Sequence, residues 1–465
     1  MLDLFFTGFI AALLGLGLRR PFFWVLAYLY VDILAPQKFT YLILPLLPIS
    51  LIAFCAAFGG WLLIDDKRDS RFTLRQFLMM ILLIYCGMTT LSADFPAEAA
   101  EKWAWVWKAL VFAIFLPLTL RTRLRFEAAI LTMALSAGAI IIAGSIKTLA
   151  SGGGYGSLKF FVNDNTGLYE GSIISCVAIA IIPLIWWLMN HGTIYPKHGS
   201  NGWLVKLFAL SLTFACLLIP IGTQARTGLL CIGLLFLLSL RSAKRRLLYL
   251  TLIGGLALAA IPLLPDSYTK RMNTIENHQS DESASTRVAV WMWTLDYVKD
   301  NPFGGGFEAY RANRLTIETR TIKTDGNTTA VAVLEVEDKG RAYHSSYFEM
   351  LGEQGWPGLM LWLWIQLLGL WQMERLRSRW RKKAAAPGAG PELQWQAPLA
   401  NALQQAQLVY LLGSVFVGIA YQPFILMLIG LQCGLWSYLR RIDSAEPRLI
   451  RRPHKLNVPD AVAAH

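Results

Sequence analysis

Three short segments of the chain carry side chains that suit the transfer of a group away from a diphosphate. Arg226 lies in GTQARTG, Arg287 in STRV and His344 in RAYHSSY. The planar fork of a guanidinium binds phosphate oxygens in pairs, which favours both arginines as diphosphate ligands. An imidazole has an ordinary pKa near 6.5, so His344 could accept a proton from a hydroxyl at neutral pH. The three residue types together predict an anion-binding site beside a general base.

Each residue also has a simpler interpretation. Arg226 could extend to lipid phosphates, Arg287 could pair with Asp281 or Glu282, and His344 could cap a helix. We expect Arg287 to open an amphipathic helix, because apolar residues follow it at three- and four-residue spacing. An anion bound at that helix start would meet free N–H groups. The helix should end at NPFGGGF, where glycines allow close backbone packing or the approach of a ligand.

The composition shows which elements must position these residues. Hydrophobic side chains make up 55% of the 465 residues and charged ones 16%, below the roughly 25% of soluble domains. Apolar runs long enough to cross a ~30 Å hydrocarbon core recur without strand-like alternation. The sequence therefore predicts an all-α polytopic membrane protein with about 12–13 transmembrane helices and one large, partly helical outer loop. The expected spans are 2–18, 21–35, 41–64, 74–92, 103–120, 127–149, 168–190, 203–222, 227–240, 246–264, 347–371, 399–420 and 422–439.

Charge orients these spans. Alternate connections and the C-terminal tail hold 27 of the 43 Lys and Arg residues, which places them in the cytoplasm by the positive-inside rule. The connections with Arg226, Arg287 and His344 then face outward, within or beside the large 265–346 loop. The net charge of +13 is thus an orientation signal and predicts no nucleic-acid partner. We expect no cleavable signal peptide, and we expect the six cysteines to be small buried hydrophobic residues.

The sequence lacks the motifs of several other kinds of active site. The chain has no DxD, HExxH or P-loop sequence and no acidic–histidine cluster with metal-ligand spacing, so the sequence predicts no metal site. The spans hold almost no Asp or Glu apart from Asp32, Glu349 and Glu353. A transporter for a charged substrate would need a polar path that these spans hardly offer.

Four motifs carry a family resemblance. They are TQARTG (223–228), STR-x3-W (285–291), NPFGGGF (301–307) and YHSSYFEMLGEQGWPGLM (343–360). Together they resemble the O-antigen ligase family of polytopic membrane glycosyltransferases, over roughly residues 160–370. The first 150 residues look like the extra region of a subgroup associated with exosortase systems, which is proposed to ligate glycans to proteins.

The resemblance implies a GT-C-like ligase in the bacterial inner membrane, with its active site facing the periplasm. Its donor would be a glycan on a polyprenyl diphosphate, bound by Arg226 and Arg287. His344 would activate a hydroxyl of the acceptor, which is lipid A core, protein or polysaccharide, and the anomeric centre would invert without metal or cofactor. Further candidates for substrate contact are Lys270, Arg271, Arg341 and Tyr343.

Two features depart from the family pattern. Ser345 follows the histidine where many members have Asn, and segment 315–337 looks inserted, with a hairpin expected about Asp325-Gly326-Asn327. This insert would shape acceptor specificity or cover the loop. An O-antigen or exopolysaccharide polymerase remains the nearest alternative, and a lipid-linked glycan transporter is a second one.

The chain divides accordingly into five expected regions. They are an N-terminal transmembrane region (1–150), a ligase core (151–371), a basic cytoplasmic linker (372–398), a C-terminal transmembrane pair (399–440) and a cytoplasmic tail (441–465).

Overall fold

Helices dominate the structure, as the composition predicts. The computed structural model describes residues 2–67, 71–151, 167–195, 202–241, 251, 255, 282–325 and 328–450. The α-helices are α1 (Leu2–Arg19), α2 (Phe22–Leu34), α3 (Ile49–Leu63), α4 (Leu74–Leu91), α5 (Pro96–Thr119), α6 (Arg123–Ser151), α7 (Gly171–His191), α8 (Gly202–Gly222), α9 (Arg226–Leu240), α12 (Glu282–Asp300), α13 (Ser346–Ala384), α14 (Gln396–Gly413) and α15 (Pro423–Ile450). Short 3-10 helices are η1 (Pro36–Lys38), η2 (Leu44–Leu46), η3 (Gly167–Tyr169), η5 (Ala309–Ala312) and η6 (Pro391–Leu393). The strands are β1 (Arg314–Asp325) and β2 (Thr328–Lys339).

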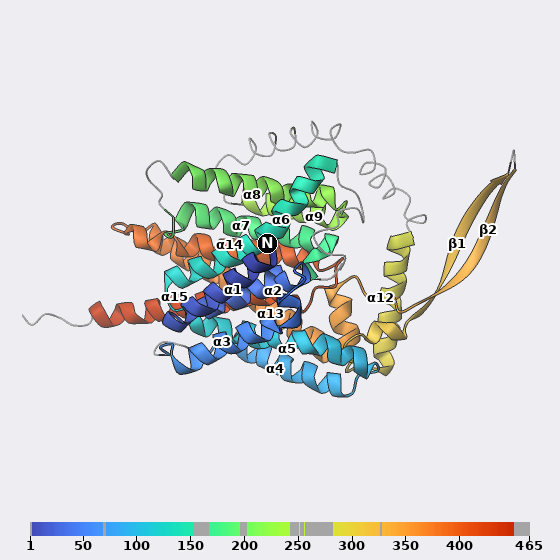
Figure 1. Ribbon diagram of the computed structural model, residues 1–465, viewed down its shortest axis with the longest axis horizontal. Helices are drawn as coiled ribbons and strands as arrows, with labels where there is room; N and C mark the ends of the chain where they lie inside the picture. The colour runs from blue at the N-terminus through green and yellow to red at the C-terminus, as the bar shows by residue number, and fades with distance from the viewer. Residues whose placement is uncertain are drawn as a thin grey trace, which may run out of the picture.

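Most helices form one bundle and run alongside each other (Figure 1). Six of the described helices, α4 to α8 and α15, are long and apolar enough to cross a membrane, and α3 and α9 are shorter apolar helices. Twelve of the thirteen expected spans contain a helix, while segment 246–264 lies outside the described residues apart from positions 251 and 255. The chain is therefore an all-α polytopic membrane protein.

The described parts of the expected outer connections gather at one end of the bundle, which we call the α12 end because α12 lies across it (Figure 1). The turn between α4 and α5 contacts the chain after α12, since Asp94 N–H donates to Gly305 O over 2.9 Å. The basic connections lie together elsewhere: Arg125 pairs with Asp65 at 2.7 Å, and Lys383 with Asp443 at 2.7 Å. This separation agrees with the charge pattern.

One basic residue of these connections is not on the surface. Arg75 belongs to a cluster expected at the cytoplasmic face, yet its side chain is fully buried. Its Nε donates to Ile365 O over 2.8 Å, and its Nη1 donates to Gln432 over 2.6 Å. Gln432 in turn donates to Gln407 over 3.0 Å, which links α4, α13, α14 and α15 by polar contacts. A buried cation needs such partners, because water no longer solvates it.

Helix α13 contains a break that the expected span 347–371 does not include. Gly355 has φ 63° and ψ −167°, so the helix consists of segments 346–354 and 356–384. Only glycine adopts this conformation readily, and Pro357 lacks the N–H that would continue the ladder. The second segment continues to Ala384, so the first part of the expected linker 372–398 is helical. Its Glu, Arg, Lys and Ala residues favour a helix until Pro387.

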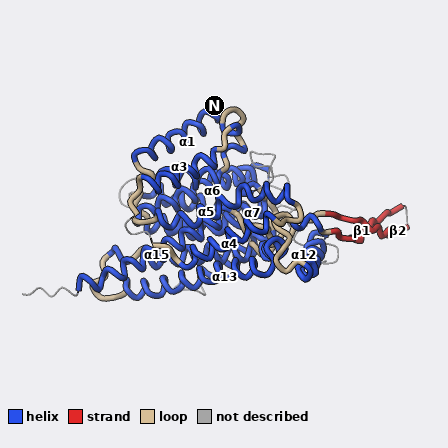
Figure 2. Tube along the Cα trace, turned by 90° about the horizontal axis from the view of Figure 1, so that it is seen from below, coloured by secondary structure: helices blue, strands red, loops and turns tan. Residues whose placement is uncertain are grey.

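The hairpin expected about Asp325 is confirmed. Strands β1 and β2 pair antiparallel from Arg314 opposite Lys339 to Asp325 opposite Thr328. Two views show the hairpin projecting away from the helices (Figures 1 and 2). It therefore does not cover the other described part of the outer loop, residues 282–313, which speaks against the covering role there.

Two smaller expectations are corrected. Cys55 is exposed, whereas the other five cysteines are buried as expected. Helix α15 continues into the expected tail as far as Ile450, and residues 451–465 lie outside the described residues.

Candidate active site

His344 lies at the α12 end, two residues before α13 begins. Its φ is 47°, in the left-handed region that residues with a side chain seldom adopt. Its neighbours Tyr343 and Ser345 are 3% and 1% exposed, while His344 itself is exposed. The backbone thus turns the imidazole outward between two buried residues. Ser345 occupies the N-cap position of α13, so His344 is not the helix cap.

Contacts on both sides hold this turn in place. Trp291 of α12 donates its indole N–H to the carbonyl oxygen of Tyr343 over 2.9 Å. On the other side, Ser346 N–H donates to Ser414 O over 2.8 Å, and the Ser346 hydroxyl donates to Val417 O over 2.9 Å. A side chain supported in this way loses little conformational entropy when it meets a substrate.

Arg287 lies one turn further into its helix than expected. Helix α12 begins at Glu282, because Glu282, Ser283 and Ala284 continue the helix toward the N-terminus. The free N–H groups of the helix start therefore do not surround Arg287, and that part of the anion-site hypothesis is wrong. The helix packs on the start of α13, where the rings of Trp291 and Phe348 stack with centroids 5.0 Å apart.

This packing brings Arg287 close to His344. The imidazole is partly exposed and partly surrounded by protein. This partial burial disfavours the charged ring and, together with the positive charges of Arg287 and Arg341, lowers the pKa of His344 below its usual 6.5. A lowered pKa leaves the imidazole neutral at pH 7, the form that can accept a proton.

Arg226 opens α9 at the same end of the bundle. Its side chain is half-buried, and the preceding Gln224 adopts a left-handed φ of 52°. Five residues along α9, the thiol of Cys231 contacts Val409 O of α14 at 3.6 Å. A Cβ at Gly413, the last residue of α14, would also lie 3.4 Å from the Cys231 sulfur, so α9 packs near the end of α14 that leads to Ser414, which binds Ser346. All three predicted site residues therefore lie around the α12 end.

The four further candidates for substrate contact lie in different environments. Arg341 is exposed and pairs with Asp338. The Tyr343 ring is buried against Gly352 and meets the Tyr310 ring edge-on at 5.6 Å, so contact between this side chain and a sugar is not supported. Burial raises the pKa of the Tyr343 hydroxyl well above its usual value. Lys270 and Arg271 lie outside the described residues.

The glycine cluster after α12 packs on the break in α13. Gly305 N–H donates to Gly352 O over 3.0 Å, and Gly306 N–H donates to Glu353 O over 2.9 Å. A Cβ at Gly304 would lie 2.5 Å from the Glu353 carbonyl oxygen. Of the two interpretations of NPFGGGF, the structure supports close backbone packing. The glycines are required because two backbones touch here.

Two residues of this region escaped the sequence analysis. Asn313 is fully buried, and its side chain binds both backbone groups of Arg341. The side-chain oxygen Oδ1 accepts the Arg341 N–H over 2.9 Å, and the side-chain Nδ2 donates to Arg341 O over 2.7 Å. Lys102 was expected in a loop, but α5 begins earlier, at Pro96, and Lys102 points into the bundle. Proline at the first helical position followed by Ala and Glu is a helix-start signal that could have indicated this.

Comparison with known families matches two segments of the chain. Residues 209–363 match the family model described as O-antigen ligase. We call residues 209–363 the O-antigen ligase segment, because this part of the chain is similar to that family. Residues 1–193 match a family of unknown function (DUF5935). No curated protein matches the chain significantly.

The O-antigen ligase segment contains Arg226, Arg287 and His344. It also contains the glycine cluster and the broken start of α13. Lys102 belongs to the other segment, so the α12 end is built from both halves of the chain.

Proposed function

We propose that the protein is a membrane glycan ligase that transfers a glycan from a polyprenyl diphosphate to an acceptor hydroxyl. The observation that carries the proposal is the placement of His344 in the O-antigen ligase segment, exposed on a supported turn with the Arg287 charge close by. The site would face the periplasm of a bacterial inner membrane, since the basic connections lie away from it.

In the proposed reaction, Arg226 and Arg287 bind the diphosphate of the donor. The neutral imidazole of His344 accepts the proton of the acceptor hydroxyl as the oxygen attacks the anomeric carbon. The bond from that carbon to the diphosphate oxygen breaks, its electron pair leaves with the polyprenyl diphosphate, and direct displacement inverts the anomeric centre. The arginines stabilise the charge that develops on the leaving group, which needs no proton and no added metal or cofactor to depart.

The decisive experiment uses purified protein in detergent or nanodiscs with a polyprenyl-diphosphate oligosaccharide. We expect release of polyprenyl diphosphate and transfer of the glycan to lipid A core or protein, with no nucleotide supplied. Transfer only to a second donor glycan, seen as a ladder of lengthened products, would identify a polymerase instead. No transfer to any of these acceptors, with correctly inserted protein, would contradict the proposal.

A further inference from the structure

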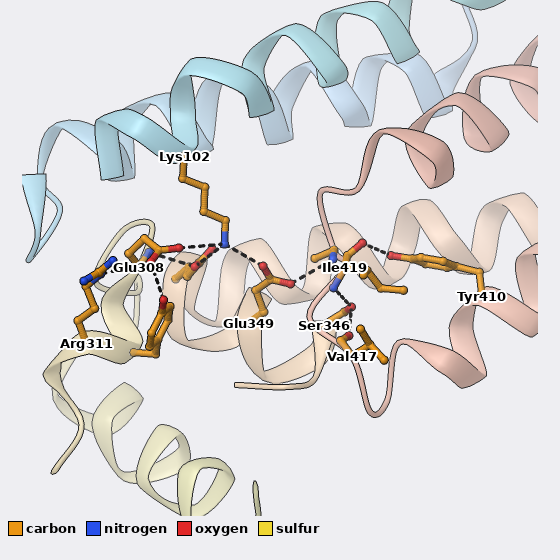
Figure 3. A network of polar contacts seen from close by, with 11 residues as sticks. Lys102, Glu308, Arg311, Ser346, Glu349, Tyr410, Val417 and Ile419 are labelled. Carbon is orange, nitrogen blue, oxygen red and sulfur yellow. Dashed lines mark hydrogen bonds and ion pairs between the residues drawn. The ribbon is translucent and has the colours of Figure 1, made fainter. Parts of the chain in front are cut away.

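Lys102 of α5 inserts its ammonium group among carboxylates of the O-antigen ligase segment. Its Nζ lies 2.8 Å from Glu349 Oε1, 2.8 Å from Glu353 Oε1 and 3.9 Å from Glu308 Oε1. The Lys102 side chain is 12% exposed and that of Glu353 is 0% exposed. Figure 3 shows the ammonium reaching down from α5 to the carboxylates. Carboxylates so far from water need a nearby cation to remain charged.

Each of these carboxylates fixes a different piece of backbone. Glu353 Oε1 also accepts the Glu308 N–H over 3.0 Å, which holds the end of the glycine cluster at a left-handed φ of 64°. Glu349 Oε2 accepts the Ala420 N–H over 3.1 Å, from the connection between α14 and α15. Lys102 therefore joins α5, segment 346–354 and two connections through a single charge.

Segment 346–354 depends on such contacts for its position. The break at Gly355 uncouples it from the long second segment of α13, so helix continuity does not fix its direction. On one side the backbone around Ser414 and Val417 holds its first turn. On the other side Lys102 binds Glu349 and Glu353, which lie one turn apart on the same helix face. His344 lies two residues before this segment, so the direction of the segment affects where the imidazole points.

Residues in and beside the α4–α5 turn add hydrogen bonds and a ring contact to the same region. Thr89 donates its hydroxyl to Gln354 over 2.6 Å, and Tyr297 of α12 donates its hydroxyl to Asp94. The Trp103 and Phe307 rings stack with centroids 6.2 Å apart. This turn thus touches both α12, which carries Arg287, and the segment that follows His344.

We propose that Lys102 is a positioning residue for His344, and that the segment of unknown function completes the ligase site through it. The inference rests on the proposed function. Lys102 touches no substrate in this scheme. Its single positive charge binds both Glu349 and Glu353, and it thereby holds segment 346–354 in the orientation that presents the imidazole.

Lys102→Met tests the proposal, with Lys299→Met as the matched control. Lys299 is exposed on α12 and pairs with Asp296 on its own helix at 2.7 Å. We expect Lys102→Met to lower the turnover of glycan transfer by about 10²-fold, the loss that a misplacement of about 1 Å can cause. Binding of polyprenyl diphosphate without a glycan should stay within about threefold of wild type, because the arginines remain. Lys299→Met should match wild type in both measurements. Wild-type turnover in Lys102→Met would overturn the inference.

A double-mutant cycle separates positioning from general destabilisation. If Lys102 acts through His344, adding Lys102→Met to His344→Ala should cause little further loss of turnover. If the double variant instead loses the product of the two single-variant losses in turnover, Lys102 acts independently of His344, and the inference is overturned. Inactive wild-type protein would count against the proposed function instead, so the two failures are distinguishable.

Lys102→Met leaves buried carboxylates without their cation and could prevent folding. The variant Lys102→Met/Glu349→Gln/Glu353→Gln removes this charge imbalance. We expect it to insert and elute as wild type does, and to recover at least about tenfold of the turnover lost in Lys102→Met. A folded triple variant with no recovery would indicate that the ammonium itself is needed by the substrate, which would overturn a positioning role.

Discussion

At the scale of single residues, His344 combines an exposed side chain with buried neighbours. Tyr343 and Ser345 are buried, and Trp291 and Ser414 bind the backbone on either side of the turn. The positive φ of His344 is a strained conformation, and such strain persists where the surrounding contacts maintain it. The side chain is therefore presented to the outside by contacts that do not involve the imidazole.

The lowered pKa of His344 predicts the acid limb of the pH–activity profile. Burial and the charges of Arg287 and Arg341 disfavour the imidazolium, so the neutral base persists at pH values where free histidine is already protonated. We expect glycan transfer to fall with acidification at a midpoint below 6.5. His344→Ala and His344→Asn should both lose about 10²–10⁴-fold in turnover. Initial rates measured across pH test this, and substantial activity in His344→Asn would exclude the general base.

The two arginines are expected to act through the shape of the guanidinium as well as its charge. Lysine replaces a planar fork with a compact charge. Arg226→Lys and Arg287→Lys should each weaken binding of polyprenyl diphosphate by about 10-fold, on the order of 1.4 kcal/mol. Both variants should insert normally. Direct measurement of polyprenyl diphosphate binding tests this. Wild-type affinity in both variants would instead indicate that Arg226 contacts lipid and that Arg287 forms an ion pair.

At the scale of elements, close backbone contact fixes the relation between α4, the glycine cluster and α13. Gly306 has φ +77°, and a Cβ there would lie 2.5 Å from Ala93 Cβ and 2.7 Å from Thr89 O. Gly355, at the break, would place a Cβ 2.2 Å from Pro302 O. These backbone contacts fix the positions of the three segments relative to one another without any charged or hydrogen-bonding side chain.

Gly306→Ala should therefore destabilise the protein more than Gly388→Ala. Gly388 has a similar φ of +80° but nothing within 4 Å of an added Cβ. Both variants incur the left-handed strain of about 1–2 kcal/mol, whereas Gly306→Ala adds an overpacking cost of about 1–3 kcal/mol. Thermal unfolding in detergent would measure the difference between them. Equal midpoints would show that the α4 contact yields easily.

The β1–β2 hairpin is expected to act on the acceptor and not on the fold. It projects from the helices and joins them through its base, so most of it contacts little of the bundle (Figure 2). Replacing residues 318–335 with Asn-Gly should keep the register pair Ile317–Val336 and a tight turn. We expect unchanged thermal stability and donor binding, with reduced transfer to a macromolecular acceptor. Unchanged transfer to every acceptor would exclude this role.

At the scale of the whole molecule, the two ends of the bundle differ in charge and in content. The α12 end holds the candidate site, and the opposite end holds ion pairs of the basic connections such as Arg125–Asp65 and Lys383–Asp443. The positive-inside rule then assigns the α12 end to the outer face.

Cysteine labelling tests this orientation. Ala97 and Ala386 are exposed alanines, near the start of α5 and just after α13. In a Cys55→Ala background, a membrane-impermeant maleimide added to spheroplasts should label Ala97→Cys and leave Ala386→Cys unlabelled until the membrane is permeabilised. The reverse pattern would place the site in the cytoplasm and contradict the proposed donor side.

The sequence by itself determined the helical membrane fold, the grouping of the outer connections and the hairpin at Asp325. These follow from local properties: the length of apolar runs, the alternation of charge and the turn residues. Arg226, Arg287 and His344 were found because their residue types and motifs are visible in short windows. The start of α12 was missed by five residues, since it lies at Glu282 and not at Arg287, as helix boundaries depend on weak local preferences.

Only the tertiary structure decided how these pieces meet. The burial of Arg75 and the insertion of Lys102 among glutamates from the other half of the chain have no local signature. Each depends on partners roughly 250 or more residues away, and a buried charge is stable only where such partners converge. The pKa of His344 belongs to the same class, since burial and the charge of Arg287, which folding brings close, lower it together with the neighbouring Arg341.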